Sequence, residues 1–360
     1  MLKKIVVIII SCAVAISVVI SSSGTPAFAQ SAAGQQTSKP QTATPNPPDQ
    51  KPDAATISIE VPVVTVDVVA TTNHGDIIPG LKKENFRILE DGVPQTITNF
   101  AAADAPITMV VLMEFSKVAY GLFSYKAREQ SYDFVRYLNK NDWVALETFD
   151  MKMRVEADFT QNKDEIKDAV AHLYFPGFSE SNVFDALLET VDRLKDVKGK
   201  KSILLLASGL DTFSKHTLDQ TMKELRQSDV TIFCVGMSRD YVEYMDSHGY
   251  MGGAGRLGYY QAENQLKTFA NMTGGRAWNP MFQGEFPGIF QDVVASLRNQ
   301  YSLAYVPANR TRDGKFHKIK VQLVAPDGSP LVVQDQKGKK QKYVVYAREG
   351  YTAPKGNIGD

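Results

Sequence analysis

Short apolar segments alternate with segments of helical periodicity through the middle of the chain, from about residue 105 to residue 299. The predicted strands are 107–113, 143–149, 153–157, 202–206 and 230–235. The predicted helices are 127–138, 164–173, 183–194, 217–226, 261–272 and 290–297. This alternation indicates a doubly wound, mostly parallel α/β sheet covered on both faces, and ligands of such sheets bind beyond the carboxyl ends of the strands.

Two β-rich stretches, 57–103 and 300–354, lie on either side of this region. Apolar and polar residues alternate from residue 57, with a change of phase at 63–64 that suggests a bulge. Asp-Gly turn pairs separate several of the predicted strands. We expect the two stretches to pair into one smaller antiparallel β domain, with the α/β unit of residues 104–299 inserted in it.

The first 29 residues have the pattern of a secretory signal peptide. Lys3 and Lys4 precede the apolar run 5–20, and Ala-Phe-Ala at 27–29 forms a cleavage site before Gln30. Residues 30–56 are rich in Gln, Ser, Thr, Ala and Pro, which predicts a disordered linker, and 355–360 form a short tail. We therefore expect a secreted or periplasmic protein. The alternative is membrane attachment, either through an uncleaved apolar segment or through a lipid on Cys12.

Composition excludes several functional classes. The 360 residues carry 40 Lys and Arg against 40 Asp and Glu, so no net charge directs the chain to nucleic acid. The two cysteines, Cys12 and Cys234, provide no disulfide framework. The five histidines lack metal-ligand spacing, and neither His-Glu-x-x-His nor Gly-x-Ser-x-Gly occurs. We expect neither an enzyme nor a cofactor.

Three segments fall at the expected carboxyl ends of strands: Glu-Phe-Ser-Lys-Val at 114–118, Ser-Asn-Val-Phe-Asp-Ala-Leu at 181–187 and Ala-Ser-Gly-Leu-Asp-Thr at 207–212. They resemble the motifs of the von Willebrand factor A domain, and specifically of the exported VWFA-related proteins of Acidobacteria. The resemblance extends over most of 57–354 and implies a Rossmann-like fold, a protein-binding role and a metal-ion-dependent adhesion site (MIDAS). The candidate metal ligands that it implies are Glu114, Ser116, Ser181, Ser208 and Asp211.

This ion site departs from the family motif at three positions. Glu114 replaces an aspartate, Val118 replaces a serine that would offer oxygen, and Ser208 replaces the aspartate of the fourth strand. Mg²⁺ prefers six hard oxygen ligands, including one or two carboxylates. With Asp211 as the candidate substitute acid, we expect a degenerate site that binds no cofactor, or Mg²⁺ or Ca²⁺ only weakly. The alternative role of its serines is to cap helices.

Residues 239–260 are predicted to form a long loop rich in glycine and tyrosine. Its tyrosines are Tyr241, Tyr244, Tyr250, Tyr259 and Tyr260. Tyrosine on a flexible scaffold is typical of binding loops, although a lid folded on the domain itself is an equal alternative. Residues 253–258 match Gly-x-Gly-x-x-Gly, but they begin some sixteen residues after the preceding strand, and a nucleotide site needs these glycines directly after a strand. We expect no nucleotide binding.

The expected function is an exported protein-binding module with an unidentified protein partner. The alternative is an anchored structural or scaffold component of the cell envelope. In either case, contact with a membrane would come only through an uncleaved or lipidated N-terminus.

Overall fold

The computed structural model describes residues 63–102, 106–117, 132, 134–173, 177–309, 312–334 and 337–356. Several predicted features lie outside these residues: the signal peptide, the linker, the strand before the proposed bulge at 63–64, Val118 and most of the predicted helix 127–138. Within the part that is described, no helix is both long enough and apolar enough to cross a bilayer.

A six-stranded, mostly parallel sheet forms the centre of the α/β region, in the order β10-β9-β8-β5-β6-β7. Its parallel strands are β5 (Thr108–Glu114), β6 (Trp143–Phe149), β8 (Lys201–Ala207), β9 (Thr231–Gly236) and β10 (Ala277–Trp278). The antiparallel edge strand is β7 (Met153–Thr160). All seven residues of β8 are buried, as expected for a central strand covered on both faces. The predicted fold class is confirmed.

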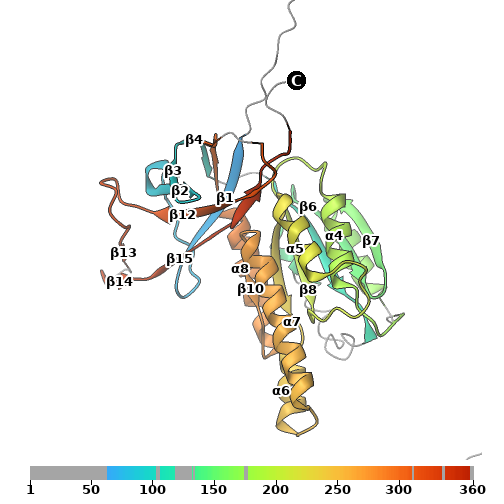
Figure 1. The fold of residues 1–360 in the computed structure, drawn as a ribbon. Helices are drawn as coiled ribbons and strands as arrows, with labels where there is room; N and C mark the ends of the chain where they lie inside the picture. The colour runs from blue at the N-terminus through green and yellow to red at the C-terminus, as the bar shows by residue number, and fades with distance from the viewer. Residues whose placement is uncertain are drawn as a thin grey trace, which may run out of the picture. The chain divides into compact units, whose positions relative to one another are not determined.

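Helices cover both faces of this sheet (Figure 1). The helices are α3 (Lys163–Ala171), α4 (Val183–Arg193), α5 (Leu218–Gln227), α6 (Arg239–Ser247), α7 (Gly253–Met272) and α8 (Phe286–Arg298). Helices α3 and α8 pack with the short 3₁₀ helix η2 (Val135–Tyr137) in one apolar cluster, and α4, α5 and α7 pack in a second cluster. The two clusters take alternate residues of the buried strands, because successive side chains of a strand point to opposite faces.

The predicted loop at 239–260 is wrong. These residues form α6, a short turn and the first turns of α7, which extend beyond the strand ends in Figure 1. One aromatic contact joins the two helices, since the rings of Tyr241 and Tyr259 lie 6.1 Å apart. At the end of α6, His248 packs on Tyr244 of the same helix at 4.4 Å. These contacts and the ion pair of Arg256 with Asp246 offset the low helix propensity of the glycines. A prediction from the sequence pattern includes this propensity but not the contacts that outweigh it.

Two four-stranded antiparallel sheets flank the α/β region, in the orders β15-β1-β11-β4 and β16-β12-β2-β3. Their N-terminal strands are β1 (Val64–Thr72), β2 (Phe86–Glu90), β3 (Val93–Gln95) and β4 (Ile97–Ala102). Their C-terminal strands are β11 (Tyr301–Tyr305), β12 (Phe316–Leu323), β15 (Tyr343–Ala347) and β16 (Gly350–Thr352). A small hairpin adds β13 (Val333–Gln334) and β14 (Lys340–Gln341), and the remaining 3₁₀ helices are η1 (Lys83–Asn85) and η3 (Gln283–Glu285).

The flanking sheets join the two ends of the described chain. β1 pairs with β11 and β15, and β2 pairs with β12, so strands from before and after the α/β region share one apolar cluster. The tight turn between β2 and β3 has positive φ at both central residues, +48° at Asp91 and +85° at Gly92. This is the geometry that an Asp-Gly pair favours in a two-residue hairpin.

A buried histidine lies among acidic side chains in these sheets. His317 of β12 places Nδ1 at 2.8 Å from the Asp91 carboxylate and Nε2 at 3.5 Å from that of Asp313, and its ring stacks on Tyr351. Burial disfavours the imidazolium, but hydrogen bonding and charge from Asp91, with Glu90 and Asp313, hold the pKa of His317 above its usual value. The His317 ring thus links β12 to the turn after β2 and to the turn before β12.

We expect His317 to make stability depend on pH. Because its pKa is raised on folding, its contribution is complete below the unfolded value of about 6.5 and is lost as pH rises through the folded value. The thermal midpoint of the wild type should therefore fall as the pH rises through the folded pKa of His317. The midpoint of His317→Gln should not show this fall. His172→Gln, at an exposed position, serves as the control. Equal pH profiles for the wild type and His317→Gln would contradict the assignment.

Candidate functional site

Three loops meet at the carboxyl edge of the parallel sheet. Glu114 ends β5, Ser208 directly follows β8, and Ser181 precedes α4. The structure brings Glu114, Ser116, Ser181 and Ser208 together, as predicted, but all four are buried, with at most 3% of each residue exposed. The site therefore lies beneath the molecular surface.

The carboxyl group of Glu114 is held by the loops around it. The Ser208 backbone N–H donates to Oε2 at 2.6 Å, and the Ser116 hydroxyl donates to Oε1 at 2.9 Å. Burial raises the pKa of Glu114, and hydrogen bonds from Ser208, Ser116 and Ser181 counter this only in part. Ser181 Oγ is buried and makes no hydrogen bond of good geometry. Both carboxyl oxygens of Glu114 are thus already engaged by protein donors.

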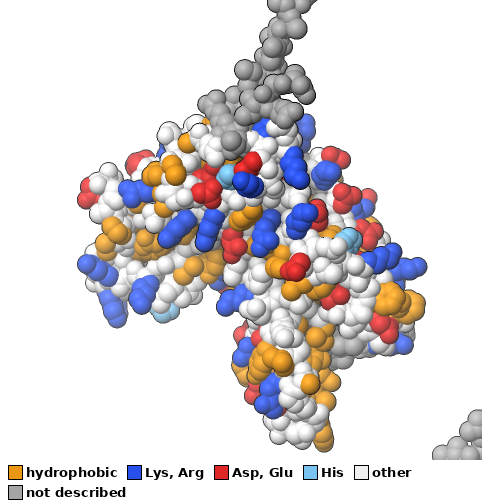
Figure 2. Space-filling model, in the orientation of Figure 1, with side chains coloured by type: hydrophobic (Ala, Val, Ile, Leu, Met, Phe, Trp, Pro, Cys, Tyr) orange, Lys and Arg blue, Asp and Glu red, His pale blue; other side chains and the backbone are white. Residues whose placement is uncertain are grey.

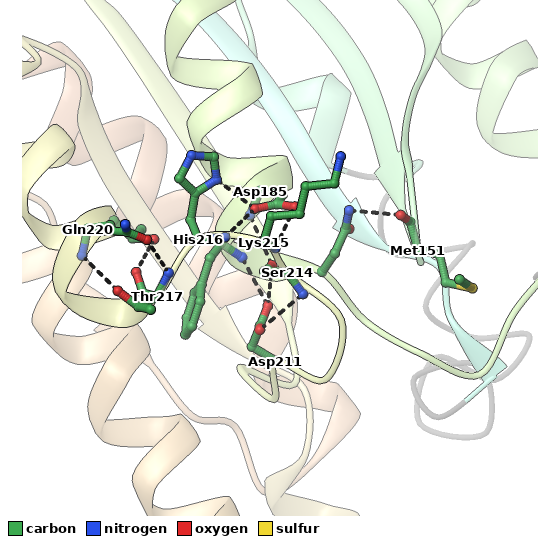
Figure 3. A network of polar contacts seen from close by, with 11 residues as sticks. Met151, Asp185, Asp211, Ser214, Lys215, His216, Thr217 and Gln220 are labelled. Carbon is green, nitrogen blue, oxygen red and sulfur yellow. Dashed lines mark hydrogen bonds and ion pairs between the residues drawn. The ribbon is translucent and has the colours of Figure 1, made fainter.

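Asp211 belongs to a different set of contacts (Figure 3). Its Oδ1 accepts hydrogen bonds from the Ser214 hydroxyl at 2.5 Å and the Phe184 backbone N–H at 3.3 Å, and Oδ2 accepts one from the Ser214 backbone N–H at 3.4 Å. Burial raises the pKa of Asp211, and the bonds from Ser214 and Phe184 lower it. The carboxylate thus stabilises the N-terminus of α4, where negative charge is favourable.

The same network contains an acid that the sequence analysis did not single out. Asp185, in the first turn of α4, accepts hydrogen bonds from the backbone N–H groups of Lys215 and His216 at 2.9 and 3.0 Å, and its Oδ1 lies 2.7 Å from His216 Nδ1. Burial raises the pKa of Asp185, but these hydrogen bonds outweigh it and leave the pKa low. The arrangement ties the segment after β8 to α4.

Further contacts connect the loop before α4 to its neighbours. The Ser181 backbone N–H donates to Thr212 Oγ1 at 2.9 Å, and the Thr212 N–H donates back to the Ser181 carbonyl at 2.8 Å. The Asn182 amide donates to the Met151 carbonyl at 3.0 Å, and Thr217 caps α5 together with Gln220 (Figure 3). These loops are therefore held in one arrangement by their own polar groups.

Helix α7 closes over the buried carboxyl group. Gly209, at φ +80°, lies so close to α7 that an added Cβ would be 2.7 Å from the Ala262 carbonyl oxygen. Ser238, just before α6, donates from its hydroxyl to the Ser208 carbonyl at 3.5 Å. Burial, with the nearby charges of Tyr241 and Glu114, raises the pKa of Tyr259. Tyr259 therefore lies near enough to Glu114 for the two charges to interact, on the helix that packs against the loop after β8.

The donor set does not fit a divalent cation. Mg²⁺ and Ca²⁺ sites combine several oxygen ligands with one or more available carboxylates. Among the described residues, the carboxyl group that the serines contact is that of Glu114, which is buried and bonded to protein donors, while Asp211 is bonded at the start of α4. Across the described ranges, no group of three or more His, Cys, Asp or Glu has the geometry to hold a metal.

The same edge of the sheet carries a concentration of exposed apolar side chains, which we call the aromatic crest. Its members are Phe178, Phe213, Tyr241, Tyr244, Tyr250, Leu257, Tyr260, Met281 and Phe282. The most exposed of these residues are Tyr250 and Phe282, at 67% and 70%. Figure 2 shows apolar side chains gathered over the end of α6 and α7.

Sequence reasoning found only part of this crest. Four of the five singled-out tyrosines belong to it, but Phe178, Phe213, Met281 and Phe282 lie in separate loops far apart along the chain. Phe213 follows β8, and Met281 and Phe282 follow β10, while the Phe178 carbonyl accepts a hydrogen bond from the Lys117 N–H after β5. All four therefore lie at the carboxyl edge of the sheet.

Comparison with known proteins identifies the α/β region. Residues 109–271 match the family model of the von Willebrand factor type A domain. No curated protein matches the chain by sequence.

Solved structures with a similar fold include BatB of Bacteroides thetaiotaomicron, at 11% identity and a TM-score of 0.39 over 53% of this chain and 98% of that one. Proximal thread matrix protein 1 of the mussel byssus matches at 17% identity and a TM-score of 0.41, over 57% of this chain and 50% of that one. A von Willebrand factor type A protein of Catenulispora acidiphila matches at 13% identity and a TM-score of 0.40, over 82% and 75%.

The contact of Gly209 with α7 gives a prediction with a built-in control. Gly209→Ala should destabilise the protein by about 1–3 kcal/mol, because it combines a positive φ with a Cβ clash against a helix backbone. Gly255→Ala, in the first turn of α7, meets only ordinary contacts and should stabilise by about 0.4–1 kcal/mol. Urea unfolding measures both changes. If Gly209→Ala is as stable as the wild type, α7 does not pack against the loop as described.

Proposed function

From the von Willebrand factor type A domain that the chain contains at residues 109–271, we propose that the protein is an exported binding module that recognises another protein through its aromatic crest, without a bridging cation. The observation that carries the proposal is a difference in exposure between two groups of side chains at the carboxyl edge of the sheet. The aromatic side chains there are exposed, whereas the oxygen ligands of the degenerate ion site are buried.

The composition and placement of the crest support a protein partner. Nine large apolar side chains from several loops and helices share this edge, and clusters of exposed apolar residues mark interaction sites. Tyrosine gives a large contact area at a low cost in side-chain entropy, and its hydroxyl can form hydrogen bonds with a partner. Such residues are typical of the energetically dominant positions in protein interfaces.

The burial of Glu114 supports recognition without a metal ion. A cation that bridges two proteins must be open to an acidic side chain of the partner, and here Gly209, Ser238 and Tyr259 bring α6 and α7 over the acid. A partner that approaches this edge meets the aromatic side chains of α6 and α7 first. The crest therefore takes the place that an ion would have in the interface.

We propose binding rather than catalysis. Asp185 and His216 are in contact at this edge, but Asp185 also accepts hydrogen bonds from two backbone N–H groups. These bonds hold the loop to α4, so the pair has a structural role. The Ser214 hydroxyl beside it donates to Asp211. Residues 253–258 form the first turns of α7 instead of a phosphate-binding turn after a strand, which supports the absence of a nucleotide.

Export rests on the N-terminal sequence. A basic start, an apolar run and a small-residue cleavage site are the features that secretion requires. We propose cleavage after Ala29 and a partner that is itself extracytoplasmic.

Substitution of exposed crest tyrosines should weaken binding and leave the fold intact. In Tyr250→Ser/Tyr260→Ser, we expect affinity for a captured envelope partner to fall about tenfold or more, because large aromatic side chains dominate such interfaces. The thermal midpoint should remain close to that of the wild type, because both side chains are more than half exposed. Biolayer interferometry and thermal unfolding measure the two effects.

A matched control is Val332→Ser, which changes a side chain that is 55% exposed but lies just before β13 of the small hairpin, outside the aromatic crest. A photo-crosslinking residue at position 250 should give a discrete adduct, whereas one at position 332 should not. Wild-type affinity in the double tyrosine variant, or crosslinking from position 332 alone, would overturn the proposed surface.

Removal of divalent cations should leave binding unchanged. Calorimetric titration of the protein with Mg²⁺, Mn²⁺ or Ca²⁺ should give no saturable heat, because the Glu114 oxygens already accept two protein hydrogen bonds. The partner should bind equally well in EDTA, and Glu114→Gln, which keeps the size of the side chain, should bind as the wild type does. Saturable heat that Glu114→Gln abolishes would show instead that the site holds a metal.

A further inference from the structure

A cavity of about 440 Å³, lined by both charged and apolar side chains, lies at the opposite edge of the central sheet from the aromatic crest. Its walls come from both parts of the fold. Lys200 and Thr231 stand at the amino ends of β8 and β9, while Asp67 and Ser302 come from β1 and β11 of a flanking sheet. Its volume is within the range of small-molecule sites, roughly 300–1,000 Å³, which often form where two domains meet.

The wall from the flanking sheet carries a carboxylate with an unused oxygen. Asp67 lies between two fully buried valines of β1, and its register partner on β11 is Ser302. Its Oδ1 is buried and makes no hydrogen bond. Burial raises the pKa of Asp67, while Ser302, Lys200 and Arg348 lower it. A buried carboxylate oxygen without a partner is costly, so this position favours a ligand that brings a donor or a positive charge.

The wall from the α/β region carries an ammonium group with unused donors. Lys200 Nζ donates to the Gln300 carbonyl at 3.3 Å. Within the described part of the chain, no carboxylate lies within 4.0 Å of it. Burial lowers the pKa of Lys200, and the charge of Asp67 raises it. An ammonium group has three donors, so this position favours a ligand that brings a negative charge.

The other charged groups of the cavity are already engaged by the protein. Arg348 donates to the backbone carbonyls of Gly350, Arg226 and Ser228. Asp229 forms an ion pair of 2.9 Å with Lys201. What the cavity offers a ligand is therefore one acceptor at Asp67 and donors at Lys200, on walls that belong to different sheets.

We propose that this cavity binds a free α-amino acid, with its ammonium group at Asp67 and its carboxylate at Lys200. A zwitterion carries both charges in one small molecule. Each partly desolvated group of the protein then gains a directly bonded partner of opposite charge, in addition to the more distant opposite charge that already acts on it. The ligand joins the flanking sheet to the central sheet. The proposal is independent of the aromatic crest, and either one can fail without the other.

The test is calorimetry and thermal unfolding of the full chain with glycine, L-alanine, L-glutamate and L-lysine as separate probes. At least one should bind saturably and raise the thermal midpoint, since a ligand that binds only the folded state stabilises it. Asp67→Asn and Lys200→Met should each weaken that binding by about tenfold or more, because each removes a charged hydrogen-bonding partner. The N-acetyl derivative of that amino acid lacks the ammonium charge, and its amide lacks the carboxylate charge. Each should bind the wild type about tenfold or more weakly than the free amino acid does.

Lys198→Met, at an exposed position two residues from Lys200, is the matched control and should bind as the wild type does. Asp67→Asn is nearly isosteric, and circular dichroism confirms that each variant is folded. The proposal is overturned if no probe binds, if the N-acetyl or amide forms bind equally well, or if both cavity variants keep the wild-type affinity.

Discussion

The desolvated carboxyl group of Glu114 is the constraint on which the functional edge of this protein depends. A carboxyl group that is fully buried needs donors, and the loops after β5 and β8 supply them from the Ser116 hydroxyl and the Ser208 backbone N–H. Those hydrogen bonds fix the start of the segment after β8, and Gly209 in that segment then allows α7 to approach closely. The cover over the acid and the surface above it therefore follow from one buried group.

Helices α6 and α7 have two different faces for this reason. Their inner side, at Ala262 and Tyr259, packs toward the buried acid and the loop after β8. Their outer side presents Tyr244, Tyr250 and Tyr260 to solvent. The packing of α7 on the loop after β8 agrees with the interpretation of the tyrosine-rich segment as a lid, and the exposed tyrosines are the basis of the proposal that it is a contact surface. They apply to different residues of one helical pair, and helical periodicity separates them.

The sequence predicts which helices and strands form better than it predicts where they end or what their side chains contact. Strand 143–149 and the α4 region agree closely with the structure, because a long apolar run or a clear 3.6-residue period has few other solutions. The predicted loop at 239–260 fails, because the low helix propensity of its glycines is outweighed there by the Tyr241–Tyr259 ring contact and the Arg256–Asp246 ion pair between α6 and α7. Propensity is a weak guide where tertiary packing decides.

The candidate ion site shows the same limit. Motif spacing correctly places Glu114, Ser116, Ser181 and Ser208 together, since parallel strands bring their carboxyl ends to one edge. Spacing does not reveal that Asp211 faces the start of α4, because that depends on the turn at Ser214. The crest is also hidden from the sequence, since Phe178, Phe213 and Phe282 become neighbours of the tyrosines only through the order of strands in the sheet.

The interrupted β domain has a consequence for biogenesis. Val64 of β1 is opposite Tyr305 of β11, and Phe86 of β2 is opposite Leu323 of β12, so these pairs close loops of more than two hundred residues. The N-terminal strands leave the ribosome, and the export channel if the chain is secreted, long before their partners exist. Until then their edges are open to wrong pairing with other chains. Early folding of the intervening α/β region shortens the distance between the N-terminal strands and their C-terminal partners. A chain that stops near residue 300 would lack β11 and β12, and the edges of β1 and β2 would stay open to pairing with other proteins.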